Sequence, residues 1–106
     1  MGNTLIAHGG ASPEGYDVTS SGTKIAGQQK LRKYLAVTNT SDAPVYLALA
    51  NSVDGVTSPA EVGKGIYLAP EGGSYELNNV NMYFDEIWAI HDQAGQMKRL
   101  CVQAGR

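Results

Sequence analysis

The chain has 106 residues, of which 42% are hydrophobic and 17% charged, and its net charge is −2. This length corresponds to one domain, and the low charged fraction argues against disorder over most of the chain. A slightly acidic balance gives no basis for nucleic-acid binding, which depends on lysine and arginine neutralising phosphates. No apolar stretch approaches the roughly 20 residues of a membrane-spanning helix. We therefore expect neither a nucleic-acid partner nor a membrane.

Residues 1–33 differ in composition from the rest of the chain. The run 9–33 is rich in glycine, serine, threonine and glutamine, and it follows a short strand expected at 4–8. A segment of this kind buries little of its own surface and is typical of a long loop. We therefore expect residues 1–33 to form an N-terminal strand and an extended arm, anchored through Val18 and Ile25. Residues 34–106 are expected to form the core domain.

A short basic run, Lys30 to Lys33, closes the predicted arm. Three of its four residues are cationic, and Leu31 is the exception. Two interpretations are open. The run is either a solvated segment that leads into the first core strand or a contact with an acidic surface of a partner.

Six short runs after residue 33 are rich in β-branched and aromatic residues, which fit the pleated, half-buried surface of a sheet. They are residues 34–38, 45–50, 65–68, 74–77, 86–91 and 99–103. Clusters of glycine, proline, asparagine and aspartate separate them, as is typical of turns. The pattern predicts an all-β domain, either an antiparallel β-sandwich or a jelly-roll-like barrel, with the N-terminal arm extending from it.

The segments between these runs carry specific turn signals. Asp54-Gly55 is a hairpin signal, and Gly72-Gly73 allows positive φ between two strands. Residues 58–62 could form a single helical turn, with Ser58 at its N-cap. Asn39-Thr40-Ser41 matches a glycosylation triplet, and we interpret it as turn chemistry.

Two of the predicted strands are apolar on both faces. In residues 45–50 and 87–90, apolar side chains occupy the odd and the even positions alike. One face of a sheet in a small sandwich normally meets water, so an arm, a loop or another subunit is expected to cover the outside. We expect a homo-oligomer, a trimer before a dimer. The expected interface residues are Tyr46, Ala48, Trp88 and Ile90.

The residues that commonly carry chemistry are few and scattered. His8 and His91 are the only histidines and Cys101 is the only cysteine, so an intrachain disulfide is excluded. His91 is expected at the surface where a strand ends, and Cys101 is expected to be buried and inert. A nucleophilic pair of these two would require their strands to be adjacent in a hairpin. Asp85 and Glu86 are not expected to act as an acid/base pair, because neighbouring strand residues point to opposite faces of a sheet. We expect them at a solvated strand start. We expect no catalytic residues, no metal site and no cofactor.

Aromatic side chains offer one alternative to a purely structural role. Tyrosine and tryptophan combine an apolar ring with a polar tip, which suits a core edge, an interface or a sugar-binding platform. The residues concerned are Tyr34, Tyr46, Tyr67, Tyr75, Tyr83 and Trp88. Core or interface use is favoured, and a ligand platform remains the alternative.

The pattern of strands and turns from Leu31 to Val102 resembles small virion proteins of tailed bacteriophages. The matching segments read LRKYLAVTNT at 31–40, APVYL at 43–47, GIYLAPEGGSYE at 65–76, IWAIH at 87–91 and LCV at 100–102. They cover about two-thirds of the chain and exclude the N-terminal arm.

The resemblance implies a β-sandwich protein of the virion, without enzymatic activity, that decorates or cements the capsid. It implies binding at capsomer junctions on the exterior of the shell after synthesis in the host cytoplasm. The implied partners are the major capsid protein and copies of the chain itself. The alternative is a receptor- or carbohydrate-binding module of a tail fibre.

Overall fold

The computed structural model describes residues 12–78 and 80–105, and this part of the chain contains eight strands and no helix. The strands are β2 (Ser12–Val18), β3 (Thr23–Ala26), β4 (Tyr34–Asn39), β5 (Val45–Leu49), β6 (Ile66–Leu68), β7 (Ser74–Leu77), β8 (Ile87–Ile90) and β9 (Lys98–Gly105). All six predicted strand runs are confirmed as β4 to β9, with ends shifted by two residues at most. None of the described residues belongs to a helix with the length and apolar character needed to cross a membrane.

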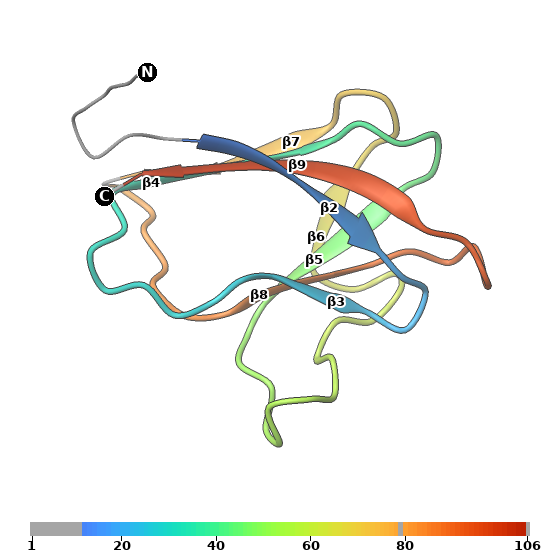
Figure 1. The fold of residues 1–106 in the computed structure, drawn as a ribbon, viewed down its shortest axis with the longest axis horizontal. Helices are drawn as coiled ribbons and strands as arrows, with labels where there is room; N and C mark the ends of the chain where they lie inside the picture. The colour runs from blue at the N-terminus through green and yellow to red at the C-terminus, as the bar shows by residue number, and fades with distance from the viewer. Residues whose placement is uncertain (1–11, 79, 106) are drawn as a thin grey trace.

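The strands form two four-stranded antiparallel sheets. One sheet has the order β2-β9-β4-β7 and the other has the order β3-β8-β5-β6. Within the described chain, β5 and β6 are the only consecutive strands that share a sheet, and every other connection crosses between the sheets (Figure 1). The prediction of an all-β fold with antiparallel sheets is therefore confirmed.

The core lies between the sheets and takes alternate residues from each strand. In β4, Leu35 and Val37 are buried while their neighbours are half-exposed, and Leu100 and Val102 do the same in β9. Twelve buried residues from the two sheets make up this cluster: Val18, Ile25, Leu35, Val37, Val45, Leu47, Leu68, Leu77, Ile87, Ala89, Leu100 and Val102. Two sheets that share one apolar layer protect each other from water, which is the main stabilising contribution in such a fold.

The N-terminal arm predicted for residues 9–33 is wrong for residues 12–26, which form β2 and β3. β2 pairs with β9 from Ser12 to Val18, and β3 pairs with β8. Val18 and Ile25, expected as mere anchors, are 0% and 2% exposed in the shared core. Polar composition hid these strands because each contributes few apolar residues to the core and pairs mainly through its backbone. The expected strand at 4–8 and His8 lie outside the described residues.

Two predicted turn structures are also corrected. Asp54-Gly55 does not form a tight hairpin, because β5 and β6 are joined by sixteen residues, 50–65, called the β5–β6 loop below. Residues 58–62 do not form a helical turn, and Ser58 Oγ instead accepts a hydrogen bond from the backbone N–H of Ala60 at 3.0 Å. In contrast, Gly72 does adopt a positive φ of 125° between β6 and β7, as predicted.

A buried asparagine joins the β4–β5 turn to the β6–β7 turn. Asn39 is 0% exposed, and its Nδ2 donates to the carbonyls of Ala43 at 2.8 Å and Leu68 at 3.1 Å. Its Oδ1 accepts from the N–H of Ser41 at 3.0 Å. The backbone of Asn39 also bonds to the β6–β7 turn, where Gly73 O accepts and Gly72 N donates. The triplet at 39–41 thus works as turn chemistry, as predicted.

Candidate functional site

The structure brings the four predicted interface residues together on the outer face of the sheet β3-β8-β5-β6. Trp88 and Ile90 form a second buried cluster with Ala60, and Tyr46 and Ala48 pack against it. Ala60 comes from the β5–β6 loop, so this loop covers part of the outer face. Of the three coverings expected from the sequence, the loop is the one observed.

This covering changes what the cluster offers to another subunit. Trp88 is 5% exposed and Ile90 is 8% exposed in a single chain, so neither has much surface left for a partner. Tyr46 and Ala48 remain half-exposed. Gly22 allows the loop to approach the β2–β3 turn closely, because a Cβ at this position would lie 2.1 Å from Ser58 Oγ. The role of the four residues in an interface between subunits stays a prediction.

The tip of the β5–β6 loop, residues 52–57, is held in shape by one carboxylate. Asp54 Oδ1 accepts from the N–H groups of Val56 at 2.8 Å and Thr57 at 2.7 Å, and Oδ2 accepts from Thr57 Oγ1 at 2.6 Å. These hydrogen bonds, led by that from the Thr57 hydroxyl, hold the pKa of Asp54 well below its ordinary value. The carboxylate therefore remains ionised, and able to accept these hydrogen bonds, throughout the physiological pH range.

A second carboxylate fastens the base of the loop to β8. Glu86 Oε1 accepts from the N–H of Ser52 at 2.9 Å and from the indole N–H of Trp88 at 3.0 Å. The N–H of Glu86 in turn donates to Asn51 Oδ1 at 3.0 Å. The hydrogen bond from Ser52 N, followed by that from Trp88, lowers the pKa of Glu86. Asp85 and Glu86 directly precede β8, as predicted, and Glu86 is hydrogen-bonded there as well as partly exposed to solvent.

The hydrogen-bonded tip displays two valines to solvent. Val53 is 105% exposed and Val56 is 81% exposed, although the loop around them is ordered by internal hydrogen bonds. The loop projects away from both sheets in Figure 1. Apolar side chains held outward on a preorganised loop lose little conformational freedom on binding. Sequence reasoning missed these residues, and the available signal was the valines beside an Asp-Gly dipeptide with Ser52 and Thr57 placed to bond Asp54.

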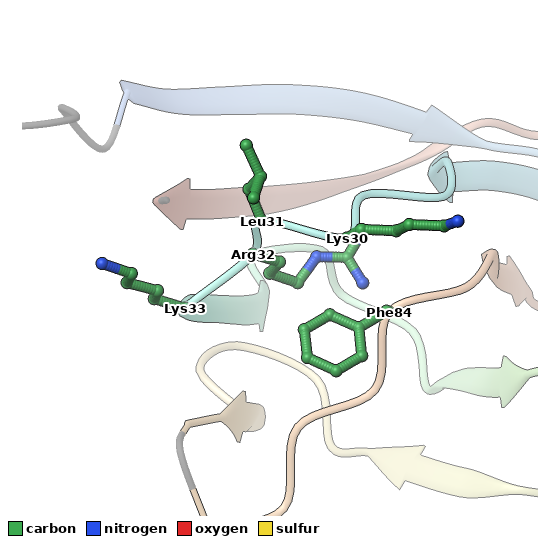
Figure 2. A pocket seen from close by; sticks show the side chains of 5 residues that line it. All are labelled: Lys30, Leu31, Arg32, Lys33 and Phe84. Carbon is green, nitrogen blue, oxygen red and sulfur yellow. The ribbon is translucent and has the colours of Figure 1, made fainter.

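A shallow depression of about 330 Å³ lies beside the basic run. Lys30, Leu31, Arg32, Lys33 and Phe84 line it, and this surface is called the basic depression below. Leu31 is 66% exposed and Phe84 is 43% exposed, so its apolar surface is open to water. Figure 2 shows the side chains of Lys30 and Lys33 extending to opposite sides of the depression. Among the described residues, neither lysine forms a salt bridge.

Arg32 lies between the two lysines but has a structural role. Its side chain is buried, with Nη1 donating to Tyr83 O at 2.6 Å and Nη2 donating to Gly27 O at 2.8 Å. Burial lowers the pKa of the guanidinium, although not enough to discharge it. Arg32 thus fastens the basic run to the 83–85 segment and fixes Leu31 beside Phe84. The solvated-segment interpretation is wrong for Arg32, while Lys30 and Lys33 are exposed as it predicts.

His91 and Cys101 do not form a nucleophilic pair. β8 and β9 belong to different sheets, so the strands that carry the two residues are not adjacent. Cys101 is half-exposed on the face of β9 opposite Leu100 and Val102, and not buried as predicted.

The expectation of a surface histidine is also wrong, because His91 is 0% exposed. Its Nδ1 accepts from the N–H of Gln93 at 2.9 Å. Its Nε2 therefore carries the proton, and it lies 2.9 Å from both Val18 O and Gln96 O. The histidine joins β2 to the 91–97 connection and has no free nitrogen for a ligand.

One exposed aromatic pair lies on the outer face of the loop-covered sheet. The rings of Tyr46 and Tyr67 meet edge to face, with centroids 5.5 Å apart and an interplanar angle of 61°. Tyr67 is 54% exposed.

In residues 12–78 and 80–105, no three histidine, cysteine, aspartate or glutamate side chains come together as metal ligands would. No family model, no curated protein and no solved structure matches this chain.

Proposed function

We propose that this chain is a structural protein of a phage virion, most specifically a capsid decoration or cement protein that stabilises the head at capsomer junctions. Two lines support the proposal. The first is the resemblance carried by residues 31–102. The second, which carries most weight, is the loop tip that displays Val53 and Val56 on a hydrogen-bonded frame. A preorganised apolar projection is suited to docking, and nothing in its frame is arranged to act on a substrate.

In this proposal the two sheets are a β-sandwich of jelly-roll-like topology, and the molecule acts by contact alone. It has no catalytic residue and no cofactor. Its partners are the major capsid protein and copies of itself, as a cyclic oligomer with the trimer favoured over the dimer, on the exterior of the shell. Each contact is small, and a repeated shell multiplies weak contacts into large collective stability.

Cryo-electron microscopy of virions that contain this chain tests the proposal. We expect the chain in symmetric copies at junctions between capsid subunits. Particles that lack it should release their genome at a lower temperature, and adding purified protein should restore the difference. Density for the chain on the tail alone, or heads that are equally heat-resistant without it, would contradict the decoration function.

The alternative function is a carbohydrate- or receptor-binding module of a tail fibre, and the exposed Tyr46–Tyr67 pair favours it. Tyrosine rings can stack on the apolar faces of sugars while the hydroxyls bond at the edge. Binding of the isolated protein to a defined glycan on an array, lost in Tyr67→Ala and kept in Val80→Ser, would support this alternative. If the protein binds no glycan on the array, the decoration function remains the better explanation.

A further inference from the structure

We infer that the loop tip of one copy docks into the basic depression of a second copy, so that Val53 and Val56 contact Leu31 and Phe84. This inference deepens the proposed function and rests on its self-assembly. The two surfaces are of opposite kind: one is an apolar projection and the other is an apolar hollow. Together they account for four of the large apolar side chains that a single chain leaves exposed.

Charge complementarity favours a second copy as the occupant. The tip carries the ionised Asp54 between its two valines, and the depression carries Lys30 and Lys33 on either side of Leu31. The carboxylate oxygens of Asp54 already accept hydrogen bonds, yet Asp54 stays exposed and keeps its negative charge. An apolar pair with a central negative charge therefore meets an apolar hollow flanked by positive charges.

Both surfaces are fixed before they meet. Asp54 and Glu86 hold the loop, and Arg32 holds the basic run against the 83–85 segment. Docking therefore orders few groups, which reduces the free-energy cost of association. The loop tip and the segment 30–33 lie at separate places in Figure 1, so the tip of a chain does not lie in the depression of the same chain.

A contact between two different surfaces of the same chain is head-to-tail. Such a contact closes into a ring when the rotation permits and otherwise extends as a filament. A ring of three satisfies every tip and every depression, which agrees with the trimer proposed above. Because the surfaces are small, we expect a dissociation constant of roughly 10–100 µM in solution.

The test measures self-association of the full chain by sedimentation velocity and light scattering across a range of concentrations. We expect concentration-dependent association that weakens at least tenfold in a Val53→Ser/Val56→Ser variant and in Lys30→Glu/Lys33→Glu. Matched controls are Val80→Ser, which changes an equally exposed valine (90%), and Lys24→Glu, which changes an exposed lysine of β3. Both controls should associate as the wild type does, and circular dichroism should show all variants folded.

Mixing the two defective variants gives the sharpest result. The lysine variant retains an intact tip and the valine variant retains an intact depression. An equimolar mixture should therefore form a one-to-one complex at concentrations at which each variant alone is monomeric. A monomeric wild type at the highest soluble concentration, wild-type association in either variant, or no complex in the mixture would overturn the inference. None of these results depends on capsid binding, which tests the proposed function separately through the location of the chain on virions.

Discussion

The β4–β5 turn and the tip of the β5–β6 loop are each organised by one short polar side chain, with opposite results. Asn39 is fully buried and spends its hydrogen bonds on joining two turns that end strands of both sheets. Asp54 is exposed and spends its hydrogen bonds within its own loop, at Val56 and Thr57. The first network stabilises the fold, and the second holds a surface in one shape.

The chemistry of each side chain suits its surroundings. Asn39 faces two carbonyls and two donors, and only an amide offers both N–H groups and an acceptor oxygen. Asp54 faces donors alone, and a carboxylate is the stronger acceptor for them. An exchange of the two residue types would place a negative charge against carbonyl oxygens at position 39. The pair therefore shows how a buried amide and an exposed carboxylate divide the work between fold and surface.

The largest expected effect is at Trp88, where the exposed loop is fastened to the body. Trp88→Ala removes a buried ring and the indole donor to Glu86, so we expect a loss of about 3–5 kcal/mol in the free energy of unfolding. Urea denaturation measures it. Tyr67→Ala is the matched control, because this aromatic residue is 54% exposed and should cost less than about 1 kcal/mol. Equal losses in the free energy of unfolding of the two variants would show that Trp88 does not fasten the loop to the sheet.

The stability of the protein should depend strongly on the amide group of the buried Asn39. Asn39→Ala leaves the carbonyls of Ala43 and Leu68 without their donor, so we expect a loss of about 2–4 kcal/mol. Asn39→Asp should be no better, because a carboxylate cannot donate to these carbonyls unless it is protonated. Chemical denaturation near neutral pH measures both. Stability of Asn39→Asp equal to that of the wild type would refute the division of roles described above.

His91 behaves as a second buried connector and should resemble Asn39 more than Asp54. His91→Ala leaves Val18 O, Gln96 O and the N–H of Gln93 unpaired, and we expect a loss of about 2–3 kcal/mol in thermal or urea unfolding. Cys101→Ser, at a half-exposed position, should cost less than about 1 kcal/mol. A harmless His91→Ala would show that water replaces these hydrogen bonds.

The smallest effect on global stability is expected at Asp54, where the effect on the loop is large. Asp54→Ala should leave the melting temperature nearly unchanged, while the amides of Val56 and Thr57 lose protection in hydrogen exchange. A large loss of stability in Asp54→Ala, with unchanged hydrogen exchange at Val56 and Thr57, would show that Asp54 stabilises the fold and not the tip.

The pH dependence of the tip follows from the lowered pKa of Asp54. A carboxylate with a lowered pKa in the folded state contributes stability above its unfolded pKa of about 3.9, and loses it as the pH falls through the folded value. The amide resonances of Val56 and Thr57 should therefore stay constant from about pH 7 down to about pH 4. A midpoint near 4 at these amides would show that the tip hydrogen bonds do not form in solution.

Periodicity was sufficient to predict β4 to β9, because alternating apolar residues such as Leu35 and Val37 report directly which face is buried. It failed for β2, where Val18 is buried at the end of a strand rich in polar residues and glycine. Such a strand is specified by backbone pairing with β9, a long-range partner that local sequence does not reveal.

The candidate site was harder to predict than the fold. The cluster of Trp88 and Ile90 could be expected from two-faced apolar strands, but its cover by Ala60 depends on the path of a sixteen-residue loop. The exposure of Val53 and Val56 depends on the Asp54 carboxylate accepting four hydrogen bonds in one conformation of the loop. Composition does not distinguish a buried valine from an exposed one, so the exposed valines of the loop tip could be identified only from the structure.

The pairing of β2 with β9 has a practical consequence for display. Ser12 and Ala104 are register partners, so β2 begins and β9 ends at the same end of their sheet. A peptide attached directly before residue 12 or directly after residue 105 would therefore emerge at this end of the sheet. The same proximity permits circular permutation of residues 12–105: a short linker could join residue 105 to residue 12, and new termini could open between Asp54 and Gly55 without cutting a strand. Such a permutant would keep all six strand pairings of the described chain while cutting the valine-bearing tip. The stability of the sheets could then be measured separately from the conformation of the tip.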